Sequence, residues 1–376
     1  ALGIPMGTPF FKIRALAEKK AVRVFSSNYT LYGDMSRRVM QTLQRFTPNL
    51  EVYSIDEAFL RLDGFRRYDL TEYGAEIRRT VARHTGIPVS VGIASTKTLA
   101  KIANERAKKI RPGPGVMNLC ANKTAQQCLE TTPVGDIWGI GPRYTALLNR
   151  SGIFTAADFC GAEDPWIQKH LTVTGLRTAA ELRGTSCLPL EEAPPPKKAI
   201  CSSRSFGRPV TTLEDLCEAA AAYVGRAAEK LRRQKSTASC IQVFLTTNPF
   251  KENAPQYANS MTRTLPRPTA STPELIEHTV RSVKKIFRSG FRYKKVWVLL
   301  SGITPAAHTQ CDLFGQTYVQ SRDRILMENM DRINRRIGPG TLRCCREGLA
   351  PDWKMKRGRL SRRFTTNWNE IPLVKA

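Results

Sequence analysis

Two adjacent carboxylates interrupt an apolar, alternating stretch, VYSIDEAFLRL, at residues 52–62. The acids are Asp56 and Glu57, and no Lys or Arg lies within three residues on either side of them. A buried carboxylate is costly unless it is paired or binds a metal ion. The pair is therefore either an exposed turn with two solvated acids or a site for a hard cation such as Mg²⁺. Tight hairpin turns favour Gly, Asn or Pro, and none is present, which favours the cation.

Two Mg²⁺ ions ~3.5–4 Å apart can align the attacking and leaving oxygens of a phosphoryl transfer. Holding two ions generally takes a third carboxylate from a neighbouring strand. No obvious candidate precedes Asp56, because Asp34 falls in a helical pattern. The residues therefore predict a phosphoryl-transfer site in which one metal ligand is missing.

A second candidate site is the stretch Trp138-Gly139-Ile140-Gly141, which precedes an apolar helical pattern and a further Gly-Ile pair. Glycines let backbone N–H groups approach a phosphate, and the N-terminus of the next helix adds a favourable dipole. An ordinary glycine-containing turn between helices is the alternative. The spacing and the charge of the chain favour a helix-hairpin-helix that binds the DNA backbone without reading its sequence.

A basic stretch, TKTLAKIANERAKK, predicts a helix that carries Lys97, Lys101, Lys108 and Lys109. Such charge runs are usually solvated helix faces. Beside a two-metal site, one of these lysines would reach a triphosphate.

A short peptide in an irregular segment, QCDLF, combines an amide, Gln310, with two apolar anchors, Leu313 and Phe314. One amide to hydrogen-bond and two side chains to fill a pocket suit a docking peptide. A loop without any such role is the alternative, because five residues are a weak signal.

The elements that would position these residues mix helices and strands. Helical patterns cover 29–46 and 69–85, strands are expected at 21–27 and 89–94, and the acids lie between them in what resembles a buried hairpin. This mixture indicates an α+β domain, followed by a mainly helical segment at 116–190.

A Pro-rich, charged linker, EEAPPPKK at 191–198, is the clearest domain boundary in the chain. The segment after it predicts the β-α-β-β-α-β order of a ferredoxin-like domain. Its strands are expected at 200–206, 239–247, 258–264 and 293–302, and its helices at 212–234 and 273–289. A charged helix from about 321 and a strongly basic end follow.

The composition favours a polyanion as partner. The chain has 376 residues, a formal net charge of +27 and a pI of about 10.1, which point first to nucleic acid. A membrane is the weaker alternative, because no apolar stretch approaches the ~18–20 residues that span a bilayer and no secretory signal is visible. Ten Cys without a CxxC pair, and four scattered His, argue against zinc and for reduced thiols in the cytosol.

Several of these stretches occur together in one known family. YSIDEAF, SVGIASTKTLAKIANERAKK, WGIG, CSSRSFG and QCDLF stand in the order seen in Y-family translesion DNA polymerases. The sequence most resembles the bacterial UmuC subgroup, the catalytic subunit of DNA polymerase V, and the resemblance covers nearly the whole chain. It implies an α+β, multidomain, right-hand polymerase with a basic C-terminal tail.

The resemblance also implies a division into domains. These are a remnant of the fingers at 1–27, a partial palm at 28–117, a helix-hairpin-helix thumb at 118–190, a linker at 191–199, a ferredoxin-like little finger at 200–304, and a clamp-binding peptide with a UmuC-type C-terminal region at 305–376.

By the same resemblance, Asp56 is similar to the palm Asp that contacts both metal ions. Glu57 is similar to the adjacent acid, which serves the ion that activates the primer 3′-hydroxyl. Lys108 matches the lysine that binds the triphosphate.

The remaining matches concern DNA and the sliding clamp. The DNA-binding matches are Gly139, Ile140 and Gly141 in the thumb and Arg204 on the first little-finger strand. The clamp-docking peptide would use Gln310, Leu313 and Phe314.

The resemblance implies a DNA-directed DNA polymerase that adds dNTPs opposite damaged template, with two Mg²⁺ ions, in SOS mutagenesis. The implied partners are primer-template DNA, dNTP, the sliding clamp, a processed UmuD-like subunit and a RecA filament, with no membrane. A cytoplasmic, nucleoid-associated bacterial protein is expected.

The departure from the family lies at the front of the sequence. The family begins with a palm strand that bears an Asp, then an aromatic that excludes ribonucleotides and a Tyr/Arg-type pair, all of which would precede Ala1. Since there is also no initiator Met, we expect an N-terminally truncated chain that lacks a central palm strand and full activity. The alternatives are a catalytically inactive remnant that binds DNA and the clamp, and a helix-hairpin-helix nuclease or glycosylase.

Overall fold

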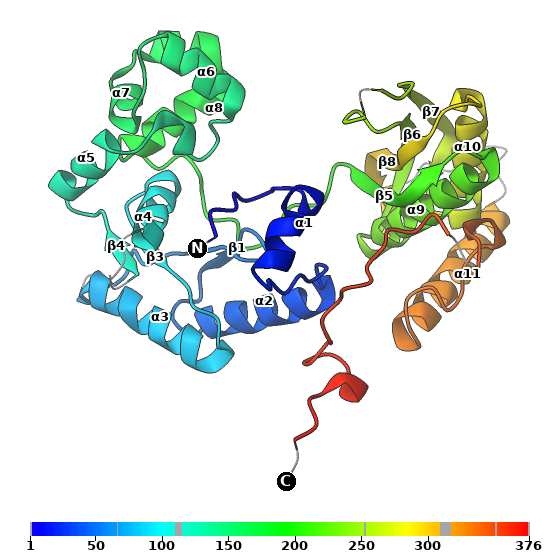
Figure 1. Cartoon of the computed structure of the whole chain (residues 1–376), viewed down its shortest axis with the longest axis horizontal. Coiled ribbons are helices and arrows are strands. Elements are labelled where there is room, and N and C mark those ends of the chain that lie inside the picture. Colours follow the sequence, from blue (N-terminus) through cyan, green and yellow to red (C-terminus); the bar gives the residue numbers. More distant parts are fainter. Residues whose placement is uncertain are drawn as a thin grey trace. The chain divides into compact units, whose positions relative to one another are not determined.

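The computed structural model describes residues 2–65, 67–109, 115–251, 253–308, 317–349 and 352–374 (Figure 1). The chain divides into two compact units. The first unit consists of Ala1–Pro194 together with Arg359–Ala376, and the second unit is Pro195–Gly358. The chain therefore leaves the first unit within the Pro-rich segment and returns to it near its end. We call Arg359–Ala376 the return segment.

The first unit mixes short strands with helices. Its elements are α1 (Phe10–Lys19), α2 (Tyr29–Leu43), β1 (Leu50–Val52), β2 (Ala58–Leu60), α3 (Leu70–Thr85), β3 (Val91–Ile93), α4 (Lys97–Lys109), β4 (Val116–Asn118), α5 (Asn122–Glu130), the 3₁₀ turn η1 (Val134–Asp136), α6 (Pro142–Arg150), α7 (Ala156–Gly161), α8 (Asp164–Leu182) and, in the return segment, η4 (Trp368–Glu370). β1 pairs antiparallel with β2, and β3 pairs parallel with β4.

Most predicted elements of this unit are present, but the strand predicted at 21–27 is wrong. Residues 22–25 are irregular, and Ser26 makes only an isolated β-bridge, to Leu360. Alternation alone does not make a strand when no neighbouring strand supplies a ladder of hydrogen bonds. The sequence also did not reveal α1 or β4.

Helix α4 lies where the two cores of the first unit meet. One core packs α2, α3 and β1 together, and the other packs α4 against the helices α5–α8, which form a group of their own in Figure 1. On its other side α4 lies directly on β3: a Cβ on Gly92 would stand 2.2 Å from the backbone nitrogen of Asn104. This close approach fixes the lysines of α4 relative to the strands.

The second unit is a four-stranded sheet with two helices packed together against one of its faces. Its elements are β5 (Ile200–Val210), α9 (Leu213–Arg233), β6 (Ser236–Thr246), β7 (Ala258–Thr269), α10 (Thr272–Ile286), β8 (Tyr293–Pro305), the 3₁₀ turn η2 (Ala306–His308), α11 (Thr317–Arg336) and the 3₁₀ turn η3 (Cys345–Glu347). The β-α-β-β-α-β order along the chain is as predicted. The order in the sheet is β5-β8-β6-β7, and every neighbouring pair is antiparallel.

The C-terminal part of the chain is anchored in each unit in turn. Trp353, 2% exposed, packs on Phe206 in the second unit, and its indole N–H donates to Glu218 at 2.8 Å. In the first unit, Asn28 Nδ2 donates to the carbonyl of Ser361 at 3.0 Å. None of the described helices is both long and apolar enough to cross a membrane.

Candidate active site

Asp56 and Glu57 lie in the turn that joins β1 to β2. The backbone N–H groups of Tyr53 and Ser54 both donate to the carbonyl of Glu57 at 3.1 Å, which closes the turn without Gly, Asn or Pro. The Ser54 hydroxyl donates to the Asp56 carboxylate at 2.7 Å and orients it. Asp56 is exposed and Glu57 is half-buried. We call residues 53–57 the acid turn.

The expected hairpin is present, but the expectation that it is buried is wrong. β1 buries Leu50 and Glu51, but Val52 is 55% exposed and Ile55 is 49% exposed. Each strand has only three residues, so the acid turn projects beyond the core that covers the start of β1. The alternative reading of an exposed turn with solvated acids therefore holds for Asp56. It does not hold for Glu57, which has an ion-pair partner.

That partner is Lys101 of α4. Its Nζ lies 3.0 Å and 2.9 Å from the two carboxylate oxygens of Glu57. One turn earlier on the same helix, Lys97 pairs with one carboxylate oxygen of Glu51 of β1. The absence of Lys and Arg near the acids in sequence thus did not mean their absence in space, since the fold supplies the cation from 44 residues away.

Two aromatic rings complete the surroundings of Lys101. Its Nζ lies 4.8 Å from the ring centroid of Tyr53 and 5.4 Å from that of Trp138, within cation–π range. The indole N–H of Trp138 donates to the Tyr53 hydroxyl at 3.1 Å. The acid turn, α4 and the residue before the predicted glycine loop therefore meet at one point.

A cavity of about 310 Å³ lies beside this point. Its lining includes Glu57, Lys101, Lys108 and Trp138, so it joins the predicted metal ligand to the predicted triphosphate lysine. Lys108 lies 3.6 Å from Glu105, with both side chains 49% exposed. The Oδ1 atom of Asn104, which also lines the cavity, is buried without a hydrogen-bond partner among the described residues.

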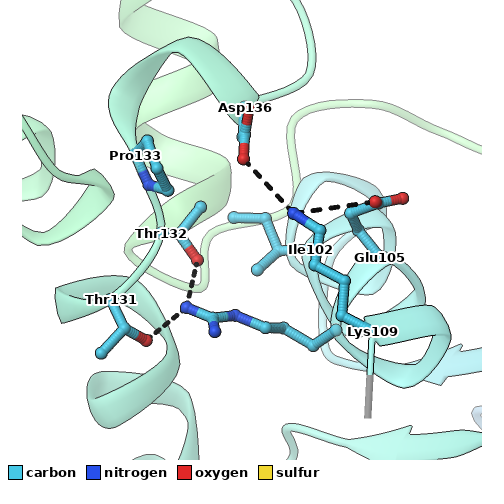
Figure 2. A pocket seen from close by; sticks show the side chains of 8 residues that line it. Ile102, Glu105, Lys109, Thr131, Thr132, Pro133 and Asp136 are labelled. Carbon is cyan, nitrogen blue, oxygen red and sulfur yellow. Dashed lines mark hydrogen bonds and ion pairs between the residues drawn. The ribbon is translucent and has the colours of Figure 1, made fainter. Parts of the chain in front are cut away.

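A second cavity, of about 260 Å³, adjoins the first and shares Ile102, Glu105, Lys109 and Asp136 with it. Figure 2 shows the Lys109 side chain between Glu105 and Asp136, and its Nζ lies 3.8 Å and 3.6 Å from their carboxylates. These contacts join α4 to η1. Lys109 is thus held in ion pairs to two acids.

The glycine loop, Gly139-Ile140-Gly141, lies between η1 and α6. Gly139 has φ +94°, a backbone conformation that L side chains rarely adopt. Ile140 is buried, whereas Gly139 and Gly141 are exposed. Gly141 is the N-cap of α6 and Pro142 its first residue, and no side chain caps this helix end. Free backbone N–H groups at a helix N-terminus suit an anion.

The other predicted residues lie apart from this cluster. Asp34 lies in α2, where its buried carboxylate accepts hydrogen bonds from Arg37 and Arg38. Arg204 lies on β5 of the second unit with an exposed side chain, opposite Val296 of β8. The predicted clamp peptide, with Gln310, Leu313 and Phe314, lies outside the described residues.

The donor chemistry of the acid turn suits a hard divalent cation, because both side chains offer carboxylate oxygens. Asp56 is open to solvent, and Glu57 faces a cavity through which an ion could enter. Over the described ranges, no group of three or more His, Cys, Asp or Glu side chains is placed to hold a metal. Asp56 and Glu57 therefore supply the type of donor that such an ion needs, but of the two only Glu57 lines the cavity, and Lys101 pairs with it there.

Residues that sequence reasoning missed are Tyr53, Ser54 and the contacts of Lys101. Tyr53 and Ser54 stand inside YSIDEAF, and Lys101 inside the basic stretch, so the motifs contained them. Their contacts depend on how α4 packs against the hairpin, and no spacing in the sequence encodes that.

Comparison with known proteins gives consistent matches along the chain. The profile of the impB/mucB/samB family matches residues 1–105, and that of the C-terminal domain of the same family matches residues 197–313. A domain of unknown function (DUF4113) matches residues 324–374.

Individual relatives extend these matches. Protein UmuC of Salmonella typhimurium (strain LT2) is 44% identical over 376 residues, which is 100% of this chain and 89% of that protein. DNA polymerase IV of Desulfatibacillum aliphaticivorans is 28% identical over 345 residues, 91% of this chain and 84% of that protein. A solved chimera of the Y-family DNA polymerases Dbh and Dpo4 has a TM-score of 0.62 at 20% identity and covers 80% of this chain and 84% of that chain; this likeness concerns the fold.

Proposed function

Because the chain belongs to the impB/mucB/samB family, we propose that it is an error-prone translesion DNA polymerase. It extends a primer opposite damaged template by adding dNTPs. The observation that carries this proposal is the cavity in which Glu57 of the acid turn and Lys108 of α4 meet Trp138, the residue before the glycine loop. A carboxylate and a lysine that line one cavity, with the glycine loop directly after a third lining residue, Trp138, suit phosphoryl transfer.

Asp56 and Glu57 would hold Mg²⁺ in this function. Bound there, the ions would supply charge stabilisation and alignment of the primer hydroxyl with the nucleotide phosphates. The chain's own part is to orient the donors. Ser54 fixes the Asp56 carboxylate, and Lys101 fixes that of Glu57.

Lys108 would bind the triphosphate. Its contact with Glu105 is exposed and lies on the same helix, and such pairs contribute little stability. Its ammonium is therefore free to turn toward a phosphate in the cavity. Lys109 faces two acids rather than one, at 3.8 Å and 3.6 Å, so it must give up more contacts to reach a phosphate and is the weaker candidate.

The glycine loop and Arg204 would bind the DNA backbone. The exposed Gly139 and Gly141 leave room for a phosphate to approach the backbone, and Gly141 begins α6. These contacts would be independent of sequence, in keeping with a net charge of +27. Arg204 would add a point charge on the edge strand β5 of the second unit.

In the right-hand description, we propose that residues 28–117 are the palm, 118–190 a helix-hairpin-helix thumb and 200–304 a ferredoxin-like little finger. The helical group α5–α8 and the four-stranded sheet support these assignments. Residues 1–27 would belong to the fingers, 191–199 to the linker and 305–376 to the C-terminal region.

Three protein partners complete the proposal. The QCDLF peptide, with Gln310, Leu313 and Phe314, would dock on the sliding clamp. A processed UmuD-like subunit and a RecA filament would join the polymerase in the SOS response. These partners rest on the resemblance of the sequence to the UmuC subgroup.

Primer extension by the full-length protein tests the catalytic assignment. Asp56→Asn and Glu57→Gln keep the size of each side chain and remove its charge. We expect each to lower the extension rate at least ~100-fold, because a divalent cation binds a charged carboxylate much more strongly than a neutral amide. Lys108→Ala should chiefly raise the KM for dNTP.

Asp63→Asn is the matched control. Asp63 follows the same hairpin, is exposed and pairs with Arg61 at 3.6 Å, so its loss should leave extension nearly unchanged. Extension at the normal rate by Asp56→Asn and Glu57→Gln would contradict the assignment of both acids.

A further inference from the structure

The two lysine–glutamate pairs of α4 differ in their surroundings. Glu51, in the pair with Lys97, also accepts the backbone N–H of Glu191 at 2.8 Å, and the Lys97 ammonium also donates to the carbonyl of Pro189 at 2.7 Å. That pair is a closed structural contact, with its side chains 12% and 9% exposed. The pair of Lys101 and Glu57 is more open, at 22% and 33%, and faces the cavity.

Lys101 occupies the oxygens that a metal ion at Glu57 would need. Its Nζ lies within 3.0 Å of both carboxylate oxygens, so the ammonium holds the carboxylate at two points. A divalent ion binds carboxylate oxygens at ~2.0–2.1 Å for Mg²⁺, which is inside that distance. The two cations repel each other across the same group, so they cannot share Glu57 without cost.

The aromatic rings give the ammonium a place to remain when it loses Glu57. Both the Tyr53 and the Trp138 rings lie within cation–π range of Nζ. The Trp138 indole donates a hydrogen bond to the Tyr53 hydroxyl, and the two rings pack edge to face at 89°. Both contacts hold the rings in position. Lys101 therefore has favourable contacts that do not depend on the carboxylate.

We propose that Lys101 is a placeholder cation: it neutralises and orients Glu57 until a divalent ion displaces its ammonium toward the Tyr53 and Trp138 rings. Lys101 is thus a positioning residue that sets how tightly the acid turn binds metal. This inference rests on the proposed function in one respect, that Glu57 is a metal ligand.

Metal binding by the whole chain, without DNA or nucleotide, tests the proposal. Mn²⁺ is the probe, and electron paramagnetic resonance measures the free ion during titration. Lys101→Gln removes the competing charge, and we expect it to tighten Mn²⁺ binding about three- to tenfold. Lys101→Arg keeps a cation over the rings and should bind Mn²⁺ like the unsubstituted protein.

Arg106→Gln is the matched control, because it removes one positive charge from the same helix and the adjoining cavity, and its guanidinium contacts Thr131 and no acid among the described residues. Its Mn²⁺ affinity should change less than about twofold. Thermal unfolding of each variant distinguishes the placeholder role from a merely structural role. Loss of a structural contact would lower the melting temperature without tightening Mn²⁺ binding.

Two other outcomes lead to different conclusions. If Glu57→Gln weakens Mn²⁺ binding but Lys101→Gln leaves it unchanged or weaker, the placeholder role is overturned and the metal assignment stands. If Glu57→Gln has no effect on Mn²⁺ binding, the metal assignment itself fails and the placeholder role fails with it.

Discussion

Arg232 of α9 and Asp331 of α11 form a two-point ion pair, in which Nε and Nη2 of the arginine each donate to a carboxylate oxygen at 2.7 Å. The side chains are 11% and 13% exposed. Arg232 also donates to the carbonyl of Ala270 and the hydroxyl of Thr272 at 2.8 Å. The pair attaches α11 to α9, one of the two helices that cover the sheet. Asp331 lies within the match to the domain of unknown function.

Removal of one partner of this pair should destabilise the second unit. Asp331→Ala leaves a largely buried guanidinium without its carboxylate, which typically costs ~3–5 kcal/mol. Urea unfolding, followed by circular dichroism, measures the loss in the free energy of unfolding. Glu229→Ala is the control: it breaks an exposed pair with Arg233 on the same helix α9 and should change stability by less than ~0.5 kcal/mol. Equal losses for the two variants would show that burial of the first pair is energetically irrelevant.

Glu347 should make the second unit less stable at neutral pH than in acid. Burial raises the pKa of Glu347, against the opposing hydrogen bond from the backbone N–H of Cys344. A raised pKa contributes stability below the unfolded value, and this contribution is lost as pH rises through the folded value. Glu347→Gln should therefore raise the melting temperature at about pH 8 and leave it nearly unchanged at about pH 4.

Glu370, which also lies in the match to the domain of unknown function, has a pKa shifted in the opposite direction. Hydrogen bonds from Arg363 lower its pKa to about 2, so its contribution is present above the unfolded value and is lost as pH falls through that value toward about 2. Glu370→Gln should then lower the melting temperature of the first unit at about pH 8.

For Glu347, a lower melting temperature of the Glu347→Gln variant at about pH 8 would contradict burial as the cause of its raised pKa.

DNA binding should depend steeply on salt. If about six phosphates are neutralised, the logarithm of the binding constant should fall against the logarithm of salt concentration with a slope near −5. Fluorescence anisotropy with labelled primer-template gives that slope. Arg204→Ala should weaken binding to all sequences alike and reduce the slope by about 1. Arg281→Ala is the control, because Arg281 is exposed but paired with Glu277 on α10. A nearly flat response to salt would contradict backbone binding.

Hydrophobic periodicity predicted most helices because it depends only on local spacing. It placed α2, α3, α9 and α10 within a few residues of their observed bounds. It failed for residues 21–27, whose apolar residues Val22 and Phe25 are 36% and 61% exposed. It also could not give the sheet order β5-β8-β6-β7, because pairing between strands distant in sequence is not a local property.

The candidate site was predictable only as separate motifs. Carboxylates, lysines and glycines have chemistry that can be read from residue type, so Glu57 and Lys108 were both named, and one cavity contains them. The link between them is Lys101, whose contact with Glu57 requires the packing of α4 on β3 through Gly92. This contact depends on how α4, β3 and the β1–β2 hairpin pack together. The residue spacing within any one of these segments cannot reveal it.

The path of the chain makes the first unit discontinuous, with consequences for cleavage. A protease that cuts once within EEAPPPKK severs only one of the two covalent routes between the units, because the second runs through Gly358 into the return segment. The downstream fragment would remain bound to the upstream fragment through hydrogen bonds. The Ser361 carbonyl accepts from Asn28, and the Arg359 carbonyl accepts from the backbone N–H of Ser26. Dissociation should therefore require a further cut near Gly358, or denaturant, and a nicked sample should co-migrate with intact protein on a native gel.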